Sequence, residues 1–149
     1  MQQDFDINIV LKKPLIASLA SSSKDGPRSS PLWFLFENDK IWLFGTDKDS
    51  FVKRLMIEPS CALSIVDFNL DKGIMQHVGI RGLAKINDVD QAKLNNFVGK
   101  YLGDNPQNWN NWFTNNIVNH INIMIEVTPE SIVAKDVSFF KTGPDLIVN

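Results

Sequence analysis

The strongest structural signal in the sequence is the stretch at residues 28–53, RSSPLWFLFENDKIWLFGTDKDSFVK. It contains two apolar runs, SPLWFLF and KIWLFG, separated by the residues Glu-Asn-Asp at positions 37–39. Asn and Asp favour the backbone conformations of tight turns, so the two runs are predicted to form a β-hairpin. Its second strand would end at Gly45-Thr46, where polar residues begin.

A predicted helix begins just after this hairpin and makes a candidate anion site. Phe51 and Leu55 are four residues apart, as on one face of a helix. The first turn of a helix has unpaired N–H groups and the positive end of the dipole, which favour an oxygen-rich anion. Ser50 would add a hydroxyl donor and Lys53 a positive charge. The alternative is a simple helix cap beside a solvated lysine.

Length and composition indicate one globular domain over residues 1–149. Hydrophobic residues make up 44% of the chain and charged residues 21%, as in ordinary globular proteins. A chain of 149 residues is long enough to bury its own core.

Charge argues against two classes of partner. The net charge of −2 and a pI near 5.6 give no basic excess of the kind that binds nucleic acid or an anionic membrane. No apolar run approaches the roughly 20 residues that span a bilayer. The N-terminus places its acidic residues before its apolar segment, the reverse of a secretory signal. We therefore expect a cytoplasmic protein.

The remaining chemistry-bearing residues suggest structural roles. Cys61 is the single cysteine and follows a proline and a serine, so a buried, inert thiol is expected. His77 and His120 are far apart and lack a carboxylate at metal-ligand spacing, so no metal site is predicted. Trp33 and Trp42 lie inside apolar strands and are expected in the core. Core packing is also the default for Trp109 and Trp112, with a cap over a pocket or a subunit contact as the alternatives.

Periodicity predicts the other elements. A short helix is expected within residues 4–13, capped by Asp4 or Asp6, and is followed by a strand at 15–23 and a turn at 24–27. Strands are predicted at 61–68 and at 74–86, with a bend or bulge marked by Gly79 and Gly82. A helix over 89–102 would be capped by Asp88 and stopped by Gly103.

The last third of the chain gives weaker patterns. A looser helix is predicted within residues 104–119, and two strands, 121–129 and 131–135, around Pro129. The tail from 136 to 149 has no clear period. Strands outnumber helices without regular βαβ alternation, so the predicted class is mainly β with flanking α, a small antiparallel barrel with outer helices.

Three blocks of sequence resemble the FMN-binding split-barrel family, whose best-known member is pyridoxamine 5'-phosphate oxidase. The first is RSSPLW at residues 28–33, and the second is Gly45-Thr46 with Ser50 and Lys53. The third is QHVGIRG at residues 76–82. The resemblance covers about residues 15–127. It implies a split β-barrel, FMN as cofactor and hydride transfer through the flavin N5.

The resemblance also implies which residues bind the cofactor. The first block would run along the flavin ring, the second would hold its pyrimidine edge and phosphate, and His77 would contact the flavin. The implied cofactor-binding residues are Arg28, Ser29, Ser30, Pro31, Leu32, Trp33, Gly45, Thr46, Ser50, Phe51, Lys53 and His77. A homodimer with the cofactor at its interface and a small-molecule substrate are implied as well.

Departures from the oxidase leave the substrate open. His77 stands where the oxidase has Gln, and Lys53 lies one residue later than in the oxidase pattern. The tail lacks the oxidase's Trp and Arg-x-His element, so oxidation of pyridoxamine phosphate is not expected. No side chain need act as a general base, and the catalytic residues are left unassigned. The alternative is a protein that binds flavin, deazaflavin or haem without turnover, in a stress or sensor role.

Overall fold

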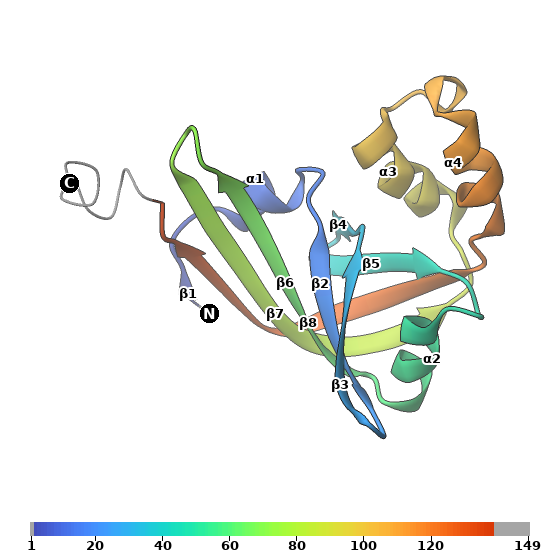
Figure 1. Cartoon of the computed structure of the whole chain (residues 1–149), viewed down its shortest axis with the longest axis horizontal. Helices are drawn as coiled ribbons and strands as arrows, with labels where there is room; N and C mark the ends of the chain where they lie inside the picture. The colour runs from blue at the N-terminus through green and yellow to red at the C-terminus, as the bar shows by residue number, and fades with distance from the viewer. Residues whose placement is uncertain (1, 139–149) are drawn as a thin grey trace.

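The computed structural model describes residues 2–138 and is built on a single β-sheet (Figure 1). Seven strands follow the order β3-β2-β6-β7-β8-β5-β4, each antiparallel to its neighbours. The short β1 pairs in parallel with β8. The predicted class, mainly β and antiparallel with flanking helices, is confirmed.

The strands are β1 (Gln2–Gln3), β2 (Ala17–Ser23), β3 (Gly26–Leu32), β4 (Leu35–Glu37), β5 (Lys40–Gly45), β6 (Ser60–Asn69), β7 (Ile74–Asn87) and β8 (Ile123–Asp136). The helices are α1 (Ile7–Leu11), α2 (Ser50–Ile57), α3 (Gln91–Leu102) and α4 (Asn111–Asn116), with single 3₁₀ turns at Pro106–Asn108 and Val118–His120. Figure 1 shows α3 and α4 together at one end of the sheet, and α2 on the other side of that end, near β3.

The hairpin predicted from residues 28–53 exists as β4 and β5, but its first strand is shorter than expected. Asn38 and Asp39 have φ values of 56° and 58°, as in the turns that suit two-residue hairpins. The apolar run before them is divided, which corrects the prediction of one continuous strand. Its first part ends β3 at Leu32 and pairs with β2, whereas its second part begins β4 at Leu35.

Two side chains of α3 hold the chain at the break between β3 and β4. The Tyr101 hydroxyl accepts a hydrogen bond from the Phe34 N–H (3.1 Å) and donates one to the Leu15 carbonyl (2.6 Å). The Lys100 ammonium donates to the carbonyls of Phe34 and Leu11, each at 2.9 Å. These contacts satisfy backbone groups that no strand partner reaches, so the chain can leave one strand and begin another.

The helices follow their predicted positions with two corrections. The Asp6 carboxylate caps α1 by accepting from the Asn8 N–H, as expected, although α1 is shorter than residues 4–13. In α3 the cap is Asp90, whose carboxylate accepts from the Lys93 N–H, and not Asp88. Gly103 ends α3 with a φ of 104°. The predicted looser helix is α4 with its two flanking 3₁₀ turns.

A bulge lies where β7 and β8 pair. Gly82 is opposite Pro129 but Arg81 is opposite Ser131, so β8 carries one extra residue at this point. A Cβ on Gly82 would lie 2.4 Å from the Thr128 carbonyl oxygen, which explains the glycine. Gly79 lies in a regular ladder, so only Gly82 marks the predicted irregularity. The bulge lets β8 pass Pro129 as one strand, which corrects the prediction of two.

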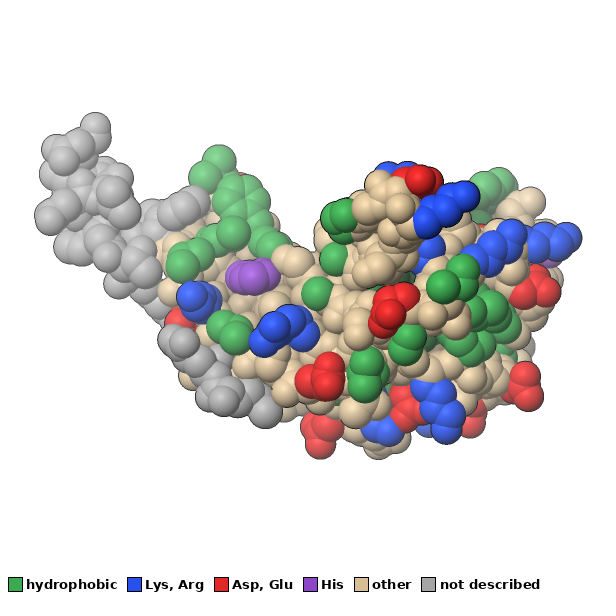
Figure 2. Space-filling view, turned by 90° about the horizontal axis from the view of Figure 1, so that it is seen from below, with side chains coloured by type: hydrophobic (Ala, Val, Ile, Leu, Met, Phe, Trp, Pro, Cys, Tyr) green, Lys and Arg blue, Asp and Glu red, His purple; other side chains and the backbone are tan. Residues whose placement is uncertain are grey.

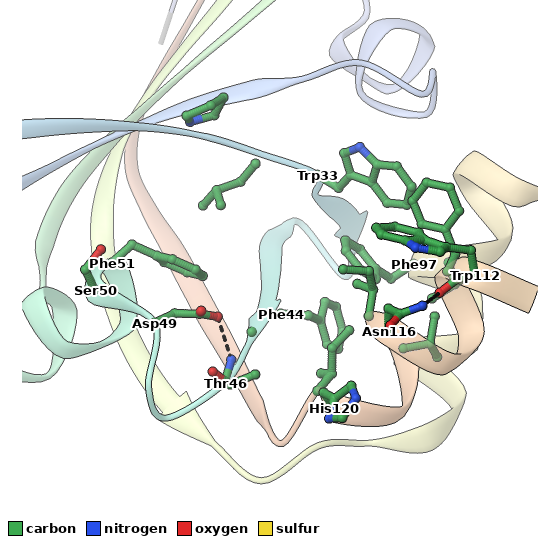
Figure 3. A pocket seen from close by; sticks show the side chains of 18 residues that line it. Trp33, Phe44, Thr46, Asp49, Ser50, Phe51, Phe97, Trp112, Asn116 and His120 are labelled. Carbon is green, nitrogen blue, oxygen red and sulfur yellow. Dashed lines mark hydrogen bonds between the residues drawn. The ribbon is translucent and has the colours of Figure 1, made fainter.

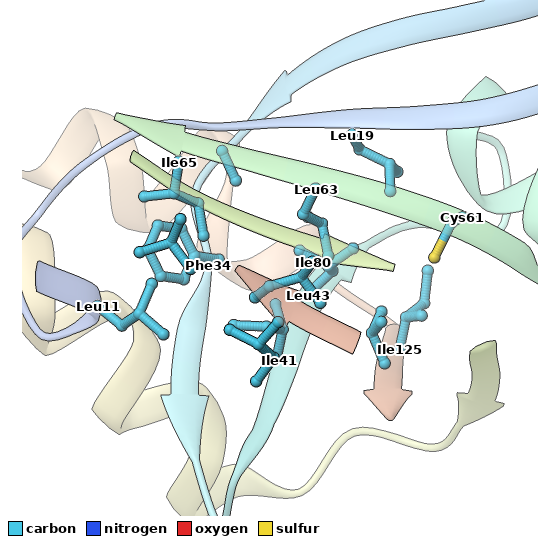
Figure 4. Close-up of a cluster of buried hydrophobic side chains, with 14 of the residues drawn as sticks. Leu11, Leu19, Phe34, Ile41, Leu43, Cys61, Leu63, Ile65, Ile80 and Ile125 are labelled. Atoms are coloured by element: carbon cyan, nitrogen blue, oxygen red, sulfur yellow. The ribbon is translucent and has the colours of Figure 1, made fainter. Parts of the chain in front are cut away.

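The core has two parts, divided by β5. Ile41 and Leu43 face the interior of the barrel, where Phe34, Leu63, Ile65 and Ile125 are fully or almost fully buried (Figure 4). Trp42 and Phe44 face the other way and pack against α3. Both faces of β5 are therefore buried, which explains its unbroken apolar run. Trp42, as predicted, is a core residue.

The described residues contain no helix that is long and apolar enough to cross a membrane. Residues 2–138 also contain no group of three or more His, Cys, Asp or Glu placed to hold a metal ion. The tail without a clear period covers residues 136–149, and its residues 139–149 lie outside the described part of the chain.

Candidate functional site

A cavity of about 740 Å³ lies where β3 and β5 end and α2 begins (Figure 3). Its far wall comes from α3, α4 and the 3₁₀ turn after α4. Seven residues of the predicted cofactor set line it, drawn from three separate segments of the chain: Pro31, Leu32, Trp33, Gly45, Thr46, Ser50 and Phe51. The structure thus brings the end of the first resembling block and most of the second to one cavity.

The turn from β5 into α2 is tightly built around Gly45. The Asp49 carboxylate accepts a hydrogen bond from the Thr46 N–H at 2.8 Å. A Cβ on Gly45 would lie 2.8 Å from that carboxylate oxygen and 2.9 Å from the Phe51 ring. Asp49 occupies the N-cap position of α2 but makes no capping hydrogen bond with its side chain. The first-turn N–H groups at Ser50 therefore keep their capacity to bind an anion.

The other five predicted residues lie away from the cavity wall. Ser29 and His77 line a second hollow, of about 450 Å³, on the outer face of the sheet. There the Nε2 atom of His77 is 2.9 Å from the Ser64 hydroxyl. Arg28 and Lys53 are exposed. Ser30 faces the barrel side of β3 and accepts a hydrogen bond from Arg54.

Arg54 is a candidate site residue that sequence reasoning missed. Its guanidinium donates to the hydroxyls of Ser21 (2.9 Å) and Ser30 (3.0 Å). It is half-buried, and no carboxylate pairs with it among residues 2–138. Half-buried charges are usually paired, so an unpaired one suggests an anionic ligand. The available signal was its position four residues after Ser50, on the same face of α2.

Aromatic rings form the far wall of the cavity. The Trp33 ring is stacked between Tyr101, with centroids 4.3 Å apart, and Phe113, with centroids 5.6 Å apart. Trp112 meets Phe113 edge to face at 5.2 Å. Burial raises the pKa of Tyr101 to about 12, so its hydroxyl stays protonated and keeps its bond to the Leu15 carbonyl. The wall is therefore fixed in position.

The resemblance placed Trp33 in the predicted cofactor set, although its side chain was expected in the core. For Trp109 and Trp112 core packing was the default, with a pocket cap or a subunit contact as the alternatives. Trp109 is indeed 8% exposed, whereas Trp112 is 57% exposed and lines the cavity with Asn116 and His120. The recurrence of aromatic residues in an Asn-rich segment was the one available signal.

The outer face of the sheet carries exposed apolar side chains beside the second hollow. Val66 and Phe68 point outward from β6, and Ile16 precedes β2 on the same side. The hollow lies in the middle of this face, where the side chains of Ser18, Ala20 and Ala62 are small. Figure 2 shows hydrophobic side chains gathered at the end of the molecule that carries the turn between β6 and β7. We call this surface the outer face.

Solved structures share this fold at low sequence identity. A conserved hypothetical protein from Mycobacterium tuberculosis has a TM-score of 0.72 and 17% identity, over 91% of this chain and 86% of its own. An F420 reductase has a TM-score of 0.66 and 20% identity, over 89% and 98%. A candidate pyridoxamine 5'-phosphate oxidase from Listeria innocua has a TM-score of 0.61 and 18% identity, over 88% and 94%.

The fold is thus that of the split-barrel proteins, which confirms the predicted architecture and the resemblance at the level of fold. Proteins of this fold differ in their ligands. Other structures that match this chain are an FAD-binding protein from Mesorhizobium loti and a haem storage protein from Vibrio cholerae. No family model matches the chain, and no curated protein matches it by sequence.

Proposed function

We propose that this protein is an FMN-dependent oxidoreductase, in which hydride passes between a small-molecule substrate and the flavin N5. The observation that supports it best is the junction at α2, where a cavity of cofactor size meets the start of the helix, one turn before Arg54, which has no carboxylate partner among residues 2–138. The volume of about 740 Å³ falls within the range of roughly 300 to 1,000 Å³ that is typical of ligand sites.

The phosphate of FMN would bind between α2 and β3. A phosphate needs several donors when it leaves water, and charged donors contribute most. Ser50 offers its hydroxyl and the helix N–H groups, and Arg54 offers the N–H groups that Ser21 and Ser30 do not use. The exposed Arg28 and Lys53 lie on β3 and α2, the same two elements. Among the described residues that line the cavity, Asp49 is the one side chain whose negative charge would oppose the phosphate.

The flavin ring would lie along the end of β3. Pro31, Leu32 and Trp33 line the cavity there, opposite Gly45 and Thr46. Backbone groups of these residues would hydrogen-bond the polar edge of the ring, so no charged side chain would be needed there. The flavin would supply the redox chemistry, and the protein would orient the ring, exclude water from it and hold the substrate beside it.

A homodimer would cover the outer face. Its exposed Ile16, Val66 and Phe68 line a shallow depression next to the second hollow, and exposed apolar patches of this kind mark interaction sites. In such a dimer Ser29 and His77, which face away from the cavity of their own chain, would face the partner subunit. Analytical ultracentrifugation should therefore give a dimer, and Val66→Asp with Phe68→Asp should shift it to a monomer.

The visible spectrum of the purified protein tests the cofactor directly. A yellow protein that NADH or NADPH bleaches supports the oxidoreductase. A yellow protein that only dithionite bleaches supports flavin binding with another electron donor or none. A protein that takes up deazaflavin or haem but no added FMN would contradict the cofactor assignment and favour the alternative.

Two variants test the phosphate site. Lys53→Ala and Arg54→Gln should each lower the FMN retained after dialysis, and Arg54→Gln should have the larger effect because its guanidinium lies between the two elements. Lys24→Ala, in the exposed turn between β2 and β3, is the control for loss of charge. Unchanged flavin content in both test variants would contradict the proposed phosphate position.

A further inference from the structure

We propose that the part of the cavity formed by α4 and the turn after it binds an uncharged, flat, aromatic molecule, and that Trp112, Asn116 and His120 select it. Its role as the redox substrate rests on the function proposed above. Its binding does not, because the argument depends only on the wall of the cavity.

The two ends of the cavity differ in charge, since the α2 end carries a carboxylate and the α4 end carries uncharged and aromatic side chains and a histidine. Among the described residues that line the cavity, the only Asp, Glu, Lys or Arg is Asp49. Figure 3 shows Asp49 and Ser50 on one side of the cavity and Trp112 and Asn116 on the other. An anionic substrate at the α4 end would lose its hydration without gaining a lysine or arginine partner among the described lining residues. A phosphorylated or carboxylate substrate is therefore disfavoured.

Ring geometry favours a flat π-system. Trp33 is held between Tyr101 and Phe113, so its position is fixed before a ligand arrives. Trp112 instead presents a 57% exposed indole at the cavity, although burial of a tryptophan is favourable. A ligand that stacks on this indole would cover it, and aromatic pairs add attraction beyond the buried area.

Asn116 supplies a neutral hydrogen-bonding group at the same place. Its Nδ2 donates to the Trp112 carbonyl at 2.9 Å, which orients the amide. Within the described residues its Oδ1 accepts no hydrogen bond, and the ring of His120 makes none. A carbonyl or amide on the edge of a ligand ring could pair with these groups. The site is thus suited to a ring system with one or two neutral polar substituents.

Naphthamide and naphthoate make a matched pair of probes, since they share one ring system and differ in charge at neutral pH. Isothermal titration calorimetry on the FMN-treated and untreated protein should show naphthamide binding roughly tenfold more tightly than naphthoate. Trp112→Ala should weaken naphthamide binding roughly five- to tenfold, and Trp112→Phe should restore part of it. Ile57→Ala, at an 85% exposed position at the end of α2, is the control.

A variant that is expected to gain binding shows that a loss in the other variants is not caused by misfolding. Asn116→Lys places a cation at the α4 end, so it should shift the preference toward naphthoate. Equal binding of the two probes, tighter naphthoate binding to the unchanged protein, or no effect of Trp112→Ala would each overturn the proposal. Naphthamide binding that depends on Trp112 in a protein that takes up no FMN would refute the proposed function and leave this inference standing.

Discussion

The ammonium group of Lys100 lies 3.4 Å from the centroid of the Phe34 ring and donates a hydrogen bond to the Phe34 carbonyl. A second bond to the Leu11 carbonyl fixes the same group to the residue that ends α1. One side chain of α3 thus holds two backbone positions that are distant along the chain. Its charge is largely removed from water, which has a consequence for stability.

Lys100 should make the free energy of unfolding depend on pH. Burial lowers the pKa of Lys100 from 10.5 to about 7. Between these values the unfolded chain binds more protons than the folded one, so stability should rise with pH as the penalty for burying the charge is relieved. Urea denaturation of the wild type and Lys100→Met across this range measures it. The difference, wild type minus variant, should increase with pH, and a flat difference would contradict the prediction.

Gly82→Ala should destabilise the protein by about 1–3 kcal/mol, the usual cost of over-packing. The added Cβ would lie 2.4 Å from the Thr128 carbonyl oxygen, and a backbone atom cannot rotate away. Gly79→Ala on the same strand is the control, because its Cβ would meet His77 at an ordinary 3.4 Å. Thermal unfolding should therefore separate the two variants, and equal losses would argue against the bulge geometry.

Asp49→Asn should tighten FMN binding roughly two- to fivefold, because it removes a negative charge beside the start of α2. The amide oxygen would still accept from the Thr46 N–H, so the turn should keep its shape. Fluorescence titration with FMN measures the change, and Asp47→Asn, in the same loop but outside the cavity lining, is the control. Weaker binding in Asp49→Asn would mean that the phosphate lies elsewhere.

Cys61 should react slowly with thiol reagents in the folded protein. Burial raises the pKa of its thiol to about 11, so little thiolate exists at neutral pH, and its sulfur contacts the Gly82 carbonyl. Ellman's reagent should label one thiol per chain only after urea is added. Rapid labelling under native conditions would show that β6 opens readily.

Local signals predicted those parts of the fold that short-range chemistry sets. The turn at Asn38 and Asp39 and the start of α2 at Ser50 each depend on residues that act on their own backbone. Gly82 gave a local sign of an irregularity whose cause, the close approach of Thr128, lies on the partner strand. The break between β3 and β4 has no such signal, since the apolar run continues through it. It is imposed by Tyr101, which lies 67 residues away from Phe34 in sequence.

The candidate site likewise has one wall that could be predicted from the sequence and one that could not. The wall from β3, β5 and α2 follows from a resemblance carried by short, contiguous blocks. The wall from α4 does not, because its Asn-rich sequence has no strong helical period and Trp112 gives no sign of its exposure. Pro129 led to the wrong prediction of two strands for a related reason. The bulge that lets β8 continue past Pro129 depends on the pairing of β8 with β7, which the local sequence does not show.

The two ends of the sheet order, β3 and β4, are consecutive along the chain and are joined only through Trp33 and Phe34. The two edge strands of the barrel are thus connected by two residues, and side chains of α3 hold one of them, Phe34, in place. Because Lys100 is 66 residues from Phe34, their contact must wait for a long loop to form, whereas β6 and β7 are joined by a short turn. We expect β6 and β7 to acquire hydrogen-exchange protection early in refolding, and the link between β3 and β4 at Phe34 to acquire it last.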